Sequence, residues 1–144
     1  GIIKNCWTAN ILAKCGLRIE DTKTPGRIYE ISVEHHKDVE VQIENVRNWT
    51  IVNLQTEENI GSENAISVDM SKSRNIRFMN YFAYRVMSIR EGHPYAMRLR
   101  DCKDIQILGG HIWSYGQKPY QNMVNLPEYS VMVPDHEINR FVLE

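Results

Sequence analysis

Carboxylate, aromatic and guanidinium side chains recur along this 144-residue chain at intervals of 27 and then 29 residues. The first set is Glu57, Tyr84 and Trp113, and the second set, one position further on, is Glu58, Arg85 and Ser114. Aromatic faces pack on the apolar side of a sugar ring, whereas carboxylates and guanidinium groups bind hydroxyl or uronate groups. We therefore expect both sets to open into one sugar-binding groove, with Gln55 as a further substrate-binding residue. The alternative is that Glu58 and Arg85 form a surface ion pair and that the aromatic rings only pack.

The same residues offer two kinds of glycan chemistry. Hydrolysis needs two carboxyl groups across a groove, and Glu57 with Glu34 or Glu58 is the best candidate pair. Elimination needs a base beside a charge-neutralised uronate. The candidates for elimination are Tyr84, Arg85 and Arg90. The residues do not decide between the two reactions.

A third cluster is the run Glu34-His35-His36. Adjacent residues of a regular strand point to opposite faces, so His35 and His36 cannot both ligate one metal ion. Glu34 and His36 could share a face and work as an acid–base pair. The alternative is one solvated histidine and one histidine hydrogen-bonded in the interior. We therefore expect no metal site here, and no cofactor.

The elements that position these groups are visible as a repeat. A cation, then Asn or Asp, then alternating apolar and polar residues occur at 47–51, 74–78 and 103–107. Self-similarity at 20–50 residues is typical of a chain that stacks one supersecondary unit on the next. Each unit alternates with period two, which indicates β-strands.

This period predicts an all-β parallel β-helix. The polar corners between strand runs lack the Asn-Gly or Asp-Gly pairs that tight hairpins prefer. A coil of 27–29 residues at ~3.3 Å each traces a loop of roughly 90 Å, and successive coils stack ~4.8 Å apart. We expect about five coils in residues 1–125, followed by a cap or exit segment in residues 126–144. Because no amphipathic helix covers the first coil, we expect the chain to be part of a longer β-helix.

Three finer features follow from the alignment of the units. Asn48, Asn75 and Asp104 should superpose at one corner, where left-handed backbone angles and shared hydrogen bonds suit Asn. Polar loops at 59–64, 91–94 and 116–119 should project from one side, where solenoids often bind ligands. The alternating apolar residues should line one continuous core. That predicted core is Val41, Ile43, Ile51, Ile66, Val68, Ile76, Phe78, Met97, Leu99, Ile105 and Ile107.

Composition excludes several classes of partner. A net charge of -1 with interspersed signs argues against a nucleic-acid-binding surface. No apolar run approaches the ~20 residues that a membrane-spanning helix needs, so we expect no membrane partner. Three cysteines are too few for a disulfide scaffold; Cys6 and Cys15 could pair locally, and Cys102 fits a small buried hydrophobe.

Three pairs of segments carry a family resemblance: 26–29 with 33–36, 48–51 with 54–58, and 84–86 with 94–96. They resemble the pectin-lyase-like superfamily, and within it a bacterial group of family 28 glycoside hydrolase-related proteins. The resemblance implies a right-handed, single-stranded coil, a plant- or algal-type polysaccharide as partner, and a secreted or periplasmic location.

The departures from that family limit what the resemblance implies. The polygalacturonase signatures Asn-Thr-Asp, Asp-Asp, Gly-His-Gly and Arg-Ile-Lys are missing, and 109–111 is only a superficial echo of one of them. The calcium-binding aspartates of pectate lyases are missing too. The leading expectation is part of a carbohydrate-active β-helix protein, either a glycoside hydrolase or a polysaccharide lyase. The alternative is a non-catalytic β-helix that binds glycan or forms a homo-oligomer.

Overall fold

The computed structural model describes residues 1–59, 61, 64–86, 91–116 and 118–144. Its strands and one short 3-10 helix are β1 (Ile2–Ala9), β2 (Cys15–Thr22), β3 (Gly26–Glu34), β4 (Val39–Glu58), β5 (Ile66–Ser71), β6 (Arg74–Arg85), β7 (Met97–Arg100), β8 (Lys103–Ser114), β9 (Val124–Leu126), η1 (Pro127–Tyr129), β10 (Val131–Val133) and β11 (Glu137–Leu143). Within this described part, no helix is long and apolar enough to cross a membrane.

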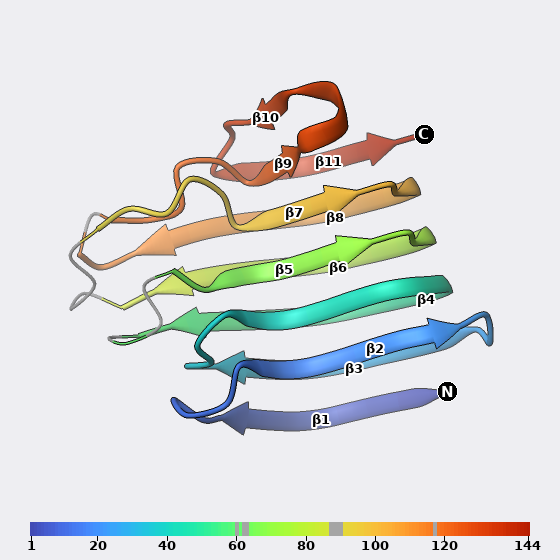
Figure 1. Cartoon of the computed structure of the whole chain (residues 1–144), viewed down its shortest axis with the longest axis horizontal. Coiled ribbons are helices and arrows are strands. Elements are labelled where there is room, and N and C mark those ends of the chain that lie inside the picture. Colours follow the sequence, from blue (N-terminus) through green and yellow to red (C-terminus); the bar gives the residue numbers. More distant parts are fainter. Residues whose placement is uncertain (60, 62–63, 87–90, 117) are drawn as a thin grey trace.

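The strands form two parallel sheets, which are the two walls of a β-helix. Sheet A stacks β1, β3, the second half of β4, β6 and β8, and sheet B stacks β2, the first half of β4, β5, β7 and β9. In Figure 1 the chain runs leftward along sheet A at the back, returns rightward along sheet B at the front, and climbs with each turn. The predicted right-handed parallel β-helix is therefore confirmed, with about four turns rather than the expected five coils.

The predicted corner of stacked Asn and Asp residues is present. Asn48, Asn75 and Asp104 occupy equivalent positions in the sheet A register and have φ of 64°, 53° and 56°. The side-chain amide of Asn75 donates a 2.8 Å hydrogen bond to Oδ1 of Asn48. Asn and Asp adopt this left-handed conformation at lower cost than most residues, which explains their presence at each turn from sheet B to sheet A.

A second left-handed column bends sheet A in the middle of its strands. Asn53, Asn80 and Gly109 have φ of 55°, 56° and 71°, and Asn80 donates a 3.0 Å hydrogen bond to Oδ1 of Asn53. We call this column the kink. It reverses the alternation: Ile51 is buried before it, and the next buried side chain is Leu54, three residues later. Every side chain beyond the kink therefore faces opposite to a simple period-two count.

All eleven side chains of the predicted core are buried, and ten of them belong to one continuous cluster; Ile66 is buried outside it. Phe78, with none of its surface exposed, packs against Tyr81 at a ring distance of 6.1 Å. Cys102 packs against this cluster while partly buried, and Cys6 and Cys15 are free thiols.

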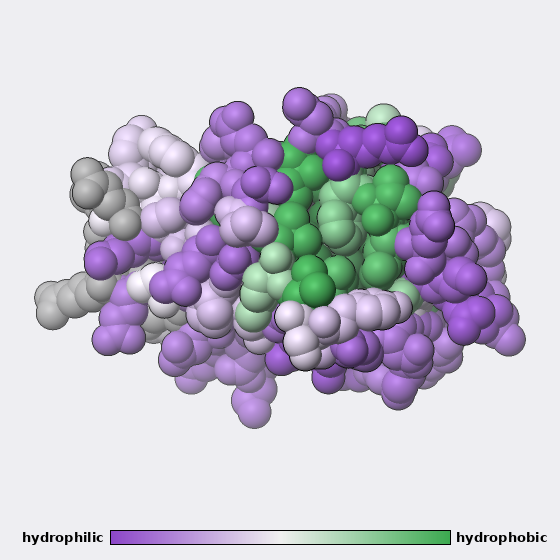
Figure 2. Space-filling view, turned by 90° about the horizontal axis from the view of Figure 1, so that it is seen from above, coloured by the Kyte–Doolittle hydropathy of each residue, from purple (hydrophilic) through white to green (hydrophobic). Residues whose placement is uncertain are grey.

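The last residues reverse the chain direction on both walls. β10 pairs antiparallel with β9, and β11 pairs antiparallel with β8. Figure 2 looks onto this end of the solenoid and shows a hydrophobic patch bordered by hydrophilic residues. Exposed apolar side chains of this segment include Val131, Met132 and Val142.

The loops that return the chain from sheet A to sheet B gather at one end of the strands. In Figure 1 the connections after β4, β6 and β8 all lie at the left. Of the three predicted loops, 91–94 lies within the described residues, whereas 59–64 and 116–119 do so only in part. The described portions agree with the prediction that the loops project from one side.

Candidate functional site

Beyond the kink, the outer face of sheet A carries two columns of side chains that run along the solenoid. Backbone pairing aligns the members of each column across successive coils. The inner column, next to the kink, is Trp7, Ser32, Gln55, Phe82 and His111, and the outer column is Ala9, Glu34, Glu57, Tyr84 and Trp113. Four strand spacings of ~4.8 Å give this face a length of roughly 19 Å, which suits an extended ligand.

A groove follows the kink beside the inner column. It consists of two depressions of about 350 and 340 Å³ that meet at Asn80 and Phe82. Ser32 and Gln55 line the first depression, and His111 lines the second. The left-handed residues Asn53, Asn80 and Gly109 line the groove. Gln55, predicted to bind substrate, thus lies in the wall of a groove.

Aromatic rings form a ladder over the C-terminal coils of this face. Phe82 stacks on His111 at 5.3 Å, and Tyr84 stacks on Trp113 at 5.6 Å between ring centroids. Tyr115 extends the ladder, 4.5 Å from Trp113. Trp113 and Tyr115 are 41% and 63% exposed, so these rings present surface to solvent rather than filling the core.

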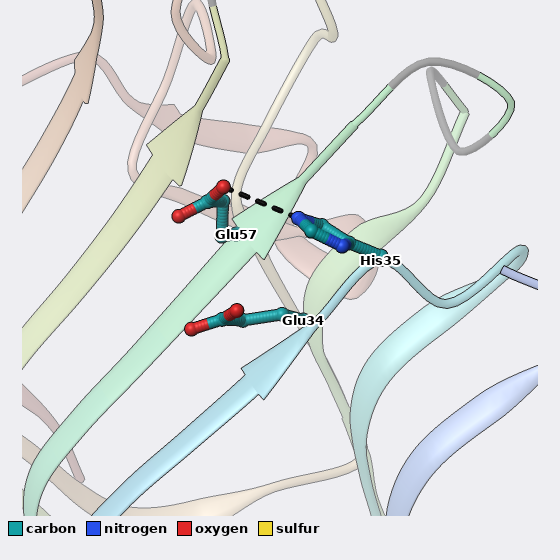
Figure 3. A group of neighbouring side chains, drawn as sticks. All are labelled: Glu34, His35 and Glu57. Atoms are coloured by element: carbon teal, nitrogen blue, oxygen red, sulfur yellow. Dashed lines mark hydrogen bonds and ion pairs between the residues drawn. The ribbon is translucent and has the colours of Figure 1, made fainter. Parts of the chain in front are cut away.

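At the neighbouring coils the same face is acidic. Glu34 ends β3 and lies opposite Glu57 of β4, and His35 follows in a left-handed conformation with φ of 66°. Figure 3 shows the Glu34 and Glu57 side chains next to each other and the His35 ring directed at Glu57, with His35 Nε2 3.2 Å from Oε1 of Glu57. A backbone hydrogen bond of 2.8 Å from His35 N to the Glu57 carbonyl fixes this approach.

The prediction that both repeating sets open into one groove is wrong for the second set. Glu57, Tyr84 and Trp113 face outward as expected, but Glu58, Arg85 and Ser114 point into the solenoid, and Glu58 and Arg85 have no exposed surface. The kink causes this, because it leaves the even-numbered side chains of β4 inside. Neither a groove position nor a surface ion pair therefore describes Glu58 and Arg85.

The interior around Glu58 is an unusual environment for ionisable groups. Burial raises the pKa of Glu58 to about 8, although the Tyr120 hydroxyl and the Arg85 cation oppose the shift. The Arg85 guanidinium carbon lies 5.1 Å over the Tyr120 ring, which is a cation–π contact. A neutral Glu58 carboxyl at pH 7 cannot reach a ligand on the outer face.

The prediction that Glu34 and His36 share a face is wrong as well. The left-handed His35 turns the chain, so His35 rather than His36 joins Glu34 outside. His36 is buried, with Nδ1 2.5 Å from a carboxylate oxygen of Glu40. Burial lowers the pKa of His36 and raises that of Glu40 to about 9, which favours a neutral pair. The interior histidine weighed as the alternative is thus the one present.

Several residues of this face were not singled out by the sequence pattern. They are Trp7, Phe82, His111, Tyr115 and His35. A signal for two of them existed, since Gln55, Phe82 and His111 follow one another at the same intervals of 27 and 29 residues. Arg90, a candidate for elimination chemistry, lies outside the described residues.

No known protein family, curated protein or solved structure matches this chain. The outer face of sheet A combines a groove, exposed aromatic rings and a carboxylate–imidazole cluster on one wall of the β-helix.

Proposed function

We propose that this chain is part of a carbohydrate-active β-helix protein and that it binds a polysaccharide along the outer face of sheet A. The single observation that supports this most is the aromatic ladder beside a groove that runs along the solenoid axis, with Phe82 and Tyr84 half-buried and Trp113 and Tyr115 exposed. A sugar chain presents an apolar ring face and polar edges, and this surface offers partners for both.

The chemistry changes along the proposed path. Trp7, 70% exposed, stands at one end, the aromatic ladder stands at the other, and Ser32, Gln55 and Glu57 lie between them. Aromatic positions at both ends would hold two sugar rings by stacking, while the polar centre bonds hydroxyl groups of the ring between.

Hydrolysis is the second candidate, favoured by the spacing of the carboxylates. One oxygen of Glu34 and one of Glu57 lie within 4.8 Å of each other. Carboxyl groups about 5–5.5 Å apart are typical of retaining glycosidases, whereas inverting enzymes hold them about 6.5–9.5 Å apart. In this scheme one carboxyl group protonates the leaving oxygen and the other attacks the sugar.

Elimination finds less support on this face. Arg85 lies in the interior, so Tyr84 is the remaining candidate among the described residues. Partial burial and the neighbouring Glu57 carboxylate raise the pKa of Tyr84, which makes proton abstraction at neutral pH harder. The raised pKa keeps the phenol protonated and able to donate a hydrogen bond to a sugar.

The test is incubation of the protein with neutral and uronate-containing plant and algal polysaccharides. Retention on immobilised glycan reports binding, new reducing ends report hydrolysis, and ultraviolet absorbance reports unsaturated products of elimination. We expect binding to at least one glycan class. If Glu57 is catalytic, Glu57→Gln should lower turnover by ~10²-fold or more with the fold intact. Glu20→Gln, the same change on an exposed residue of β2, is the control. Failure to bind any glycan contradicts the proposal.

A further inference from the structure

The Glu34–His35–Glu57 cluster has a feature that sugar binding does not require. One carboxylate oxygen of each glutamate and one ring nitrogen of His35 all lie within 4.8 Å of one another. The His35 and Glu57 side chains are 23% and 22% exposed, so the cluster is sheltered but reachable from solvent. Three atoms of metal-ligand type thus lie near one another on this face (Figure 3).

Among the described residues, the two carboxylates of the cluster outnumber the one group paired with them that can carry positive charge, the His35 imidazole. Glu34 and Glu57 are directly paired across β3 and β4, and like charges opposite one another destabilise a sheet. Within the described part of the chain, neither carboxylate pairs with a lysine or an arginine; Glu57 contacts His35 alone as an ion-pair partner. A cation between the two carboxylates would remove the repulsion that the fold otherwise sustains.

Neighbouring polar groups hold the potential ligands in place. Ser32 Oγ donates a 2.5 Å hydrogen bond to Glu34, and the Gln55 amide lies 3.5 Å from the same oxygen. Such hydrogen bonds to the ligands orient them and are typical of protein metal sites.

We propose that Glu34, His35 and Glu57 bind a divalent transition-metal ion, and that zinc fits them best. Two carboxylates and one imidazole form a three-ligand set that leaves a fourth position open for water or substrate. Ligand atoms ~2.1 Å from a tetrahedral zinc ion lie ~3.4 Å apart, and the 3.2 Å between His35 and Glu57 already meets this. Calcium and magnesium prefer oxygen ligands, so the imidazole ligand favours a transition metal over either of them.

The test is calorimetric titration of the chelator-treated protein with zinc chloride, without any glycan. We expect one zinc ion per chain, and a loss of affinity of at least ~10-fold in Glu34→Gln, His35→Gln and Glu57→Gln. His111→Gln is the matched control, because His111 forms a similar 3.2 Å pair with Glu137 but lacks a second carboxylate. The control should bind zinc as the unchanged protein does. Titration with calcium should give at least ~10-fold weaker binding.

Cobalt substitution supplies an independent readout. A cobalt ion at this site should give the visible bands of tetrahedral nitrogen and oxygen coordination, without the charge-transfer band that a ligand such as Cys6 would add. Any one of three results would overturn the proposal. They are no zinc binding, zinc binding that survives all three substitutions, and a cobalt–thiolate band. These outcomes are separable from failure of glycan binding, which is measured on the metal-free protein.

Zinc also separates this proposal from hydrolysis by a free carboxylate pair. A bound ion occupies both carboxylates, so hydrolysis through Glu34 and Glu57 as acid and nucleophile should be inhibited by saturating zinc and restored by chelator. Activity that instead requires zinc would support the metal site and contradict the free-pair mechanism.

Discussion

Two columns one residue apart in sequence have opposite environments. Glu57, Tyr84 and Trp113 form a solvent-facing column with stacked rings, whereas Glu58, Arg85 and Ser114 are enclosed by the core. The chemical types overlap, since each column begins with a glutamate. What differs is the side of sheet A that each column faces, and a single left-handed residue per coil decides that side. Candidate sites in a β-helix therefore depend on its kinks as much as on its period.

The largest difference between the two sides should appear in stability. Phe78 is enclosed and Phe82 lies on the outer face of the same strand. We expect Phe78→Ala to lower the free energy of unfolding by ~3–5 kcal/mol, because a stacked core cannot close around the void. Phe82→Ala should cost only about 1 kcal/mol, the worth of its ring contacts. Chemical denaturation measures both, and equal losses would contradict the assigned sides.

The pH dependence of stability should report the burial of Glu58. The pKa of Glu58 is raised to about 8 in the fold, from 4.5, so the folded state binds one more proton than the unfolded state between these values. The contribution of Glu58 to the free energy of unfolding is therefore fully present below about pH 4.5. It falls, by up to about 1.4 kcal/mol per pH unit, as the pH rises to about 8. Glu40, raised to about 9, acts with the same sign.

Substitution tests this assignment. Glu58→Gln keeps the shape of the side chain and removes its titration. The free energy of unfolding should then fall less steeply between pH 5 and 7, by about 1.4 kcal/mol per pH unit, which corresponds to one proton. Thr50→Ala, on the same strand β4, removes no titratable group, so it is the control and should leave the slope unchanged. Denaturation midpoints at several pH values supply the measurement. An unchanged slope in Glu58→Gln would mean that Glu58 is ionised in the core.

A smaller effect should come from the kink itself. Asn80→Ala should cost about 1–2 kcal/mol, because alanine adopts a left-handed φ at a higher energy and cannot donate to Asn53. Asn80→Gly removes the amide but keeps the backbone freedom, so it should recover part of the loss. Thermal unfolding of the two variants separates the cost of the left-handed backbone from the cost of the lost hydrogen bond. Equal costs would show that the backbone conformation contributes nothing.

The period of the chain predicted the parallel coils, the Asn48–Asn75–Asp104 corner and the buried core, because stacking forces equivalent residues into register. It did not predict the sides of Glu58, Arg85 and His36. Which side of the sheet these side chains face depends on left-handed residues inside a strand. Counting with a period of two residues takes no account of such residues. The position of the kink is nevertheless marked in the sequence, since Asn53, Asn80 and Gly109 follow one another at intervals of 27 and 29 residues.

The left-handed conformation of His35 is not marked in the sequence in this way. Histidine adopts this conformation more often than most residues, but nothing in the run Glu34-His35-His36 marks which histidine does so. The choice depends on contacts from the next coil, where the Glu57 carbonyl and carboxylate receive the backbone and the ring of His35. Non-local contacts of this kind cannot be predicted from local sequence.

The most direct test of the central claim, that the outer face of sheet A binds polysaccharide, is the affinity of Trp113→Ala for the best glycan of the panel. Tyr129→Ala is the control, because Tyr129 is also an exposed aromatic residue, 61% against 41% for Trp113, and lies on η1, away from the outer face of sheet A. We predict at least ~10-fold weaker binding for Trp113→Ala, equal to about 1.4 kcal/mol, and unchanged binding for Tyr129→Ala. Unchanged affinity in Trp113→Ala, with its fold intact, would contradict the account.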